Sequence, residues 1–188
     1  MRADAARNLQ VVLRESARLL GADPGARITD IAAAAGMDRR TIYRRFQSRE
    51  ELLHAIYRAR LDALEAVIDG ARVDEAPVLV ALHALAEGGI RVSREWPVDI
   101  RVATEPDVLR RRGELNERMA AFFRRAERDG VLVSGLPESW PLALFQGILR
   151  TLAQDLPDLP TGRAADLAVD SFLRGLATEQ VPARRSTS

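Results

Sequence analysis

Five arginines fall between residues 39 and 49, and no acidic residue interrupts them. They are Arg39, Arg40, Arg44, Arg45 and Arg49. A guanidinium group is planar, stays charged, and forms paired hydrogen bonds with phosphate oxygens or with O6 and N7 of guanine. Thr41 and Tyr43 stand among them and add hydroxyl groups on a short and a long arm. Such a set can recognise a polyanion, and double-stranded DNA offers both phosphates and guanine edges.

Two short helices with a tight turn between them are predicted around this arginine cluster. The first runs from about residue 30 to 35, behind Thr29, which can act as its N-cap. Gly36 ends it, and Asp38 can cap the second helix, which runs from residue 39 to about 46. Two helices joined by a short turn containing glycine are typical of the helix-turn-helix, whose second helix enters the DNA major groove.

A basic helix face exposed to water would explain five arginines alone more simply. The combination with the surrounding residues favours DNA binding. Residues 32–35 are all alanine, which allows two helices to pack closely. Ile42 and Phe46 lie four residues apart on one face of the second helix, whereas Tyr43 and the neighbouring arginines occupy the other face.

Apolar periodicity predicts helices in the rest of the chain, so the predicted fold is all-α with about nine helices. One helix spans about residues 4–21, and a longer one leads from Ser48, its predicted N-cap, to about Gly70. Five more are predicted near residues 75–93, 97–103, 104–129, 139–154 and 162–177. Arg110, Arg111 and Arg112 are interpreted as a solvated turn of helix, with an acidic ligand or partner as the alternative.

Charge divides the chain into two parts. Residues 1–60 hold 12 Arg and seven Asp or Glu, a net charge of +5. Residues 61–188 hold 16 Arg and 20 Asp or Glu, a net charge of −4. A basic N-terminal part on an acidic body indicates that the N-terminal part is the one that meets a polyanion.

Composition excludes several other classes of site. The 188 residues contain no cysteine, which rules out disulfides, thiol nucleophiles and cysteine zinc ligands. The two histidines are 29 residues apart, and neither a Gly-rich phosphate loop nor a Gly-x-Ser-x-Gly motif is present. We therefore expect no enzyme, no metal and no cofactor. No apolar run approaches the roughly 20 residues of a membrane span and no signal peptide is evident, so a cytoplasmic location is expected.

The N-terminal part resembles the DNA-binding domain of the TetR (tetracycline-repressor-like) family over about residues 5–57. The segments that carry the resemblance are TDIAAAAGM at 29–37, RRTIYRRF at 39–46 and SREELL at 48–53. The resemblance implies a homodimer that binds a palindromic operator, acts as a repressor and is released by a small-molecule inducer. We divide the sequence into four segments: a helix-turn-helix DNA-binding domain (1–47), a connecting helix (48–70), a ligand-binding and dimerisation domain (71–178) and a tail (179–188) whose polar composition predicts disorder.

The same resemblance assigns roles to single residues. It implies that Arg39, Thr41 and Arg44 reach bases and that Thr29, Tyr43, Arg45 and Arg49 hold phosphates. Arg40 stands where the family often has a small residue, and it is retained as a DNA-binding candidate. A helical interaction or adaptor protein without sequence-specific DNA binding is the alternative, although the intact basic helix speaks against it.

The helix predicted near 139–154 carries apolar residues on two sides, and the last predicted helix has one broad apolar face. An intramolecular core or a dimer interface would explain these faces equally well. The family pairs these helices with their symmetry mates, which favours the dimer. Aromatic and polar side chains of the body could line a ligand pocket, but each is explained as well by core packing. No pocket residue is assigned among them: His83, Trp96, Met119, Phe122, Phe123 and Gln146.

Overall fold

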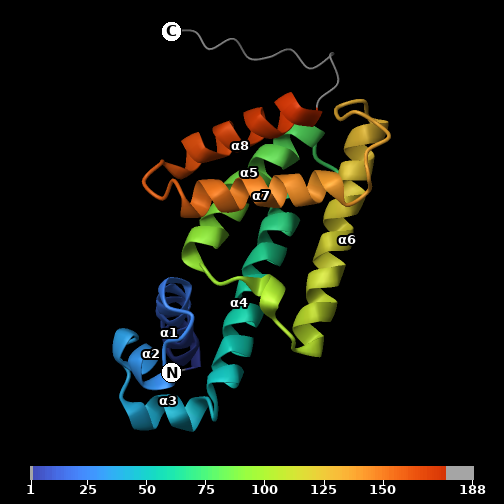
Figure 1. Ribbon diagram of the computed structural model, residues 1–188. Helices are drawn as coiled ribbons and strands as arrows, with labels where there is room; N and C mark the ends of the chain where they lie inside the picture. The colour runs from blue at the N-terminus through green and yellow to red at the C-terminus, as the bar shows by residue number, and fades with distance from the viewer. Residues whose placement is uncertain (1, 177–188) are drawn as a thin grey trace. The chain divides into compact units, whose positions relative to one another are not determined.

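The computed structural model describes residues 2–176, which form eight α-helices, one 3-10 helix and no strand (Figure 1). They are α1 (Arg2–Ala22), α2 (Ile28–Ala34), α3 (Arg39–Arg45), α4 (Arg49–Ala71), α5 (Val78–Glu95), the 3-10 helix η1 (Ile100–Val102), α6 (Pro106–Arg128), α7 (Trp140–Gln154) and α8 (Thr161–Leu176). The predicted all-α fold is thereby confirmed. The predicted tail at 179–188 lies outside the described residues.

Contacts divide the chain into two compact units. The first, called unit 1, contains the residues up to Ala66 together with Arg91–Gly113. The second, unit 2, contains Val67–Ile90 and the residues from Glu114 on. Helices α4, α5 and α6 each contribute residues to both units.

The core of unit 1 explains how α3 is held. One stripe of α1 is buried, and its members Leu13, Ala17 and Leu20 are at most 5% exposed. Helix α2 packs on α1, and α3 packs on α2. Ile31 of α2 and Ile42 of α3 are fully buried. Because α3 has only seven residues, this packing rather than its own helix propensity must stabilise it.

Two predicted helix starts differ from the structure. Thr29 is not the N-cap of α2, since α2 begins at Ile28 and Arg27 occupies the N-cap position. The carboxylate of Asp30 accepts a hydrogen bond of 3.1 Å from the Arg27 N–H, which places the start of the helix before Thr29. The predicted short helix near 97–103 is a single 3-10 turn, η1, because the Asp99 carboxylate accepts from the Arg101 N–H only two residues later.

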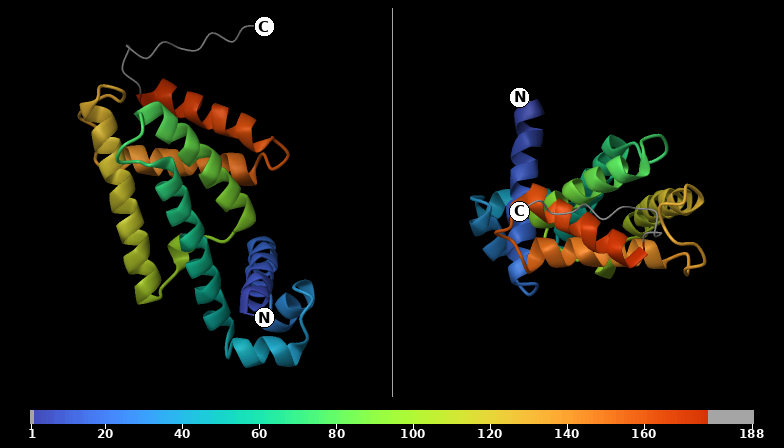
Figure 2. Two further views of the ribbon diagram at one scale, coloured as in Figure 1. Left: turned by 180° about the vertical axis from the view of Figure 1, so that it is seen from behind. Right: turned by 90° about the horizontal axis from the view of Figure 1, so that it is seen from above.

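Unit 2 has an aromatic core under its two C-terminal helices. Helices α7 and α8 lie side by side in each view (Figures 1 and 2). Phe145 of α7 and Phe172 of α8 meet edge to face at 5.3 Å between ring centroids, and Phe123 of α6 lies within 5.8 Å of both. Among the described residues, no helix is both long and apolar enough to cross a membrane.

Candidate nucleic-acid interface

The turn between α2 and α3 is fixed by backbone bonds and one glycine. The Met37 N–H donates to the Ala32 carbonyl at 2.8 Å, and the Gly36 N–H donates to the Ala33 carbonyl at 3.1 Å. Gly36 has a φ of +65°, the left-handed region that side chains with a Cβ disfavour. The helix-turn-helix predicted from this glycine is therefore formed, and α3 is its second helix.

Asp38 begins α3 with two hydrogen bonds to one residue. Its carboxylate accepts the Thr41 N–H at 2.9 Å and the Thr41 hydroxyl at 2.6 Å. The hydroxyl bond is the first cause of a lowered pKa of Asp38, the backbone bond is the second, and the charge of Arg44 adds to them. The cap was predicted from the sequence. The bond to the hydroxyl was not, although a spacing of three residues allows it.

The exposed face of α3 carries most of the predicted DNA contacts. The side chains exposed there are Arg39, Arg40, Tyr43, Arg44 and Arg45. Tyr43 is 39% exposed, and the Arg39 guanidinium lies 5.6 Å from the centroid of its ring. Within the part of the chain that the structure describes, no ion pair to a carboxylate is found for any of the four arginines. The donors of this face are therefore oriented outward without an internal acidic partner.

Thr29 and Arg49 are placed differently from the α3 set. Thr29 lies inside the first turn of α2 and is half-buried. Arg49, the first residue of α4, donates from Nε to the Ala26 carbonyl at 3.0 Å and from Nη2 to the Pro24 carbonyl. Its side chain thus ties the start of α4 to the loop before α2. Both residues belong to unit 1 with α3, and their phosphate roles stay predictions.

The start of α4 is capped as the sequence predicted. The Ser48 hydroxyl accepts the Glu51 N–H at 3.1 Å, and the Glu51 carboxylate accepts the Gln47 N–H at 2.6 Å. These bonds satisfy N–H groups at a helix start that would otherwise lack partners. They also fix the direction in which the chain leaves α3.

A second set of contacts in unit 1 binds the end of α5 to neighbouring helices. Arg14 of α1 pairs with Glu95, and its guanidinium lies 5.9 Å from the ring centroid of Trp96. Arg60 of α4 donates to the Trp96 carbonyl, and burial lowers the pKa of Arg60 to about 10. Segment 95–96 is therefore bound to both α1 and α4.

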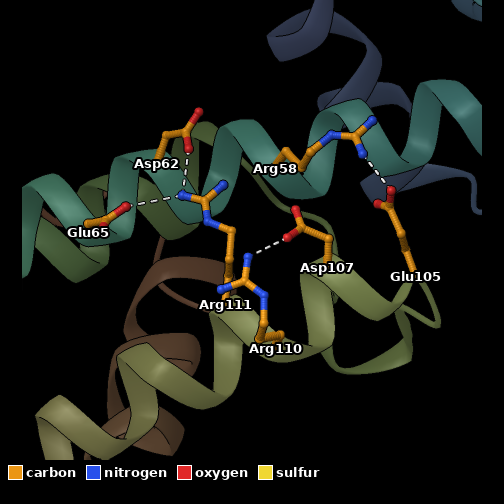
Figure 3. A network of polar contacts seen from close by, with 7 residues as sticks. All are labelled: Arg58, Asp62, Glu65, Glu105, Asp107, Arg110 and Arg111. Carbon is orange, nitrogen blue, oxygen red and sulfur yellow. Dashed lines mark hydrogen bonds and ion pairs between the residues drawn. The ribbon is translucent and has the colours of Figure 1, made fainter.

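Ion pairs connect the start of α6 to α4 (Figure 3). Arg111 donates to Asp62 at 2.7 Å and to Glu65 at 3.1 Å. Arg112 donates to the Ile100 carbonyl at 3.0 Å. The predicted solvated turn at 110–112 is therefore wrong for Arg111 and Arg112, which are half-buried. Their partners come from other segments, which helical spacing alone cannot identify.

A search of the described residues finds no group of three or more His, Cys, Asp or Glu side chains arranged to hold a metal ion. The polar chemistry of unit 1 is dominated by guanidinium groups instead. Four exposed members of this set stand together on α3, which makes α3 the candidate interface.

Comparison with known proteins agrees with this geometry. The sequence profile of the bacterial regulatory proteins of the tetR family matches residues 16–56, which contain α2, α3 and the capped start of α4. The chain is also similar to the HTH-type transcriptional repressor LfrR of Mycolicibacterium smegmatis. The two are 26% identical over 181 residues, which cover 92% of each chain.

Solved structures share the fold over nearly the whole chain. LfrR from Mycobacterium smegmatis in complex with proflavine superposes with a TM-score of 0.75 at 23% identity, covering 93% of this chain and 99% of that one. AibR in complex with isovaleryl coenzyme A and operator DNA gives a TM-score of 0.71 at 22% identity, covering 87% and 97%. With the family match over the helix-turn-helix, these findings confirm the resemblance seen in the sequence: residues 16–56 match the tetR family of regulators, and the chain is a DNA-binding transcriptional regulator.

Proposed function

We propose that this regulator is a repressor that binds a palindromic operator as a homodimer and is released by a small molecule. The observation that carries the DNA-binding part is the exposed face of α3, where four arginines form no ion pair with a carboxylate of the described residues. Four like charges within seven residues repel one another, and a bound polyanion removes that cost.

The proposed division of labour on α3 follows from reach and chemistry. Arg39 and Arg44 are long enough to pair with guanine O6 and N7 in the major groove. Tyr43 and Arg45 hold phosphates, which fix register but carry no base information. Arg40 is exposed in the same way and serves as an additional cation. Thr29 and Arg49 complete the phosphate contacts from the starts of α2 and α4.

We assign dimerisation to α7 and α8. Phe145, Leu149 and Leu152 of α7 are buried inside unit 2. The other stripe of α7 is more open, with Trp140 48% exposed, and Leu167 of α8 is 45% exposed. Burying two such faces against a second copy would give the two-fold symmetry that a palindrome requires.

We propose that ligand binding releases the DNA by moving α5. The residues of α5 up to Ile90 belong to unit 2, whereas those from Arg91 on belong to unit 1, so α5 takes part in both. Its end is bound to α1, on which α2 packs, through the pair of Glu95 and Arg14. A ligand bound in unit 2 that shifts α5 would therefore pull on α1. The solved complex of LfrR contains proflavine, and this dye is a suitable first probe of ligand binding.

The test is a selection of genomic DNA fragments with the purified protein at two salt concentrations. We expect a palindromic site with half-site centres about 34–36 Å apart, or one helical turn. Recovery of fragments without a shared sequence would instead indicate a non-specific binder. Failure to retain DNA at low salt, with no small molecule released on denaturation, would favour the helical adaptor protein.

A further inference from the structure

Three residues are predicted to reach bases: Arg39, Thr41 and Arg44. The hydroxyl of Thr41 already forms a hydrogen bond at the start of α3. Its hydroxyl donates to the Asp38 carboxylate at 2.6 Å, while its N–H donates to the same carboxylate at 2.9 Å. A hydroxyl has a single proton to donate. While this bond lasts, Thr41 cannot donate to a guanine edge or to a phosphate.

The bond is of the strong kind. An O–H group donating to an ionised carboxylate forms a short, charge-assisted hydrogen bond of about 2.5–2.7 Å. The hydroxyl of Thr41, its N–H and the charge of Arg44 all lower the pKa of Asp38. The carboxylate therefore stays ionised at neutral pH, and the threonine proton stays committed to it.

Fixing the hydroxyl also fixes the methyl group. Threonine is branched at Cβ, so one χ1 angle sets the positions of both Oγ1 and Cγ2. Thr41 is half-buried, between the fully buried Ile42 and the exposed Arg40. Its neighbour one turn later, Arg44, is exposed and lies within the electrostatic reach of Asp38. The apolar part of Thr41 is thus held rigidly beside a cation suited to a guanine.

We propose that Thr41 reads the C5-methyl group of a thymine through its own methyl group, and that Asp38 is the positioning residue that turns the methyl group outward. The inference rests on the proposed function, since it requires α3 to lie in the major groove. Thymine is the base that presents a methyl group there, so the contact distinguishes it from every other base. The interaction is apolar and needs no donor from the protein.

The experiment compares thymine with uracil, which differs only by lacking that methyl group. The operator recovered by selection is synthesised with one symmetric pair of thymines at a time replaced by uracil. Binding of the wild type, Thr41→Val and Thr41→Ser is measured by fluorescence anisotropy. Valine keeps a methyl group and loses the hydroxyl, and serine does the reverse.

We expect one pair of thymines at which uracil weakens wild-type binding about three- to fourfold per half-site, the effect of one buried methyl group. Thr41→Val should show the same loss at that pair, because the single preferred χ1 angle of a helical valine holds a methyl group there without the bond to Asp38. Thr41→Ser should bind both operators equally. Wild type that binds the operator but is indifferent to uracil at every position overturns the inference while leaving the proposed function intact. Loss of discrimination in Thr41→Val but not in Thr41→Ser would assign the contact to the hydroxyl and overturn it as well. A wild type without any preferred DNA site would refute both.

Asp38→Ser tests the positioning role. Serine still offers an oxygen to the Thr41 N–H, so α3 keeps a cap, but it has no second carboxylate oxygen for the Thr41 hydroxyl. We expect the ratio of thymine to uracil affinity to fall towards one, with the thermal unfolding midpoint close to that of the wild type. An unchanged ratio would remove Asp38 from the proposal.

Discussion

Two helices of this protein are rich in arginine, and they use it in opposite ways. In α6, Arg111 is bonded to Asp62 and Glu65, Arg118 to Asp69 at 2.6 Å, and Arg124 to Glu117 at 2.7 Å. In α3, the four arginines form no ion pair with a carboxylate of the described residues. The residue type is the same, and the partners differ.

Charge alone therefore does not identify a DNA-binding helix. Carboxylates from α4 and from α6 itself use the guanidinium donors of α6, which therefore connect segments of the protein. On α3 the donors remain for an external anion.

Raising the salt concentration should distinguish the arginines of α3 from those of α6 most clearly. A dimer that holds roughly six to ten phosphates loses about 10³–10⁵ in DNA affinity between 50 and 200 mM salt, because bound counterions are no longer released favourably. The ion pairs of α6 should respond little, with the free energy of unfolding changing by less than about 1 kcal/mol. Anisotropy titrations and urea unfolding at both salt concentrations measure the two quantities. A DNA affinity insensitive to salt would contradict the role of α3.

Arg44→Ala should weaken operator binding by about 1–3 kcal/mol and relax the preference at one base position per half-site. The reason is that a bidentate arginine contact with guanine is lost. Repeating the site selection with the variant measures the preference, and Arg124→Ala is the matched control on α6. An unaltered preference for Arg44→Ala would show that this arginine contacts only the backbone.

Tyr43→Phe should cost about 0.5–1.5 kcal/mol of binding, the usual contribution of one hydrogen bond. Since a phosphate carries no base information, the loss should be the same for the operator and for unrelated DNA. Titrating both DNAs with the variant provides the comparison. A loss confined to the operator would place the hydroxyl on a base.

Arg111→Met should lower the free energy of unfolding by up to about 1 kcal/mol, because two carboxylates of α4 lose their partner. DNA affinity should remain within about twofold of the wild type. Urea unfolding and an operator titration test the two halves of this prediction. A variant of unchanged stability with weakened operator binding would place Arg111 in the DNA interface. The arginines of α6 would then not be purely structural.

Local chemistry made much of the fold predictable. The helix starts at Asp38 and Ser48 and the turn at Gly36 follow from residue types within a few positions of one another, and all three are confirmed. The N-cap of α2 was predicted wrongly at Thr29, because the Asp30 carboxylate reaches back to the Arg27 N–H and moves the start of the helix.

Contacts between distant segments could not be predicted in the same way. Arg49 binds carbonyls 23 and 25 residues earlier in the chain, and Arg111 binds a carboxylate 49 residues earlier. No periodicity connects such positions. The sequence therefore showed on which helix face each arginine lies. It did not show which arginines bind a carboxylate or carbonyl of a distant segment.

The most direct test of the central claim is one set of operator titrations with single arginine-to-alanine variants of both helices. Arg39, Arg40, Arg44 and Arg45 represent α3, and Arg111, Arg118 and Arg124 represent α6. We predict that every α3 variant binds the selected operator more weakly, while the α6 variants bind it as the wild type does. Equal losses from the two helices, or losses confined to α6, would contradict it.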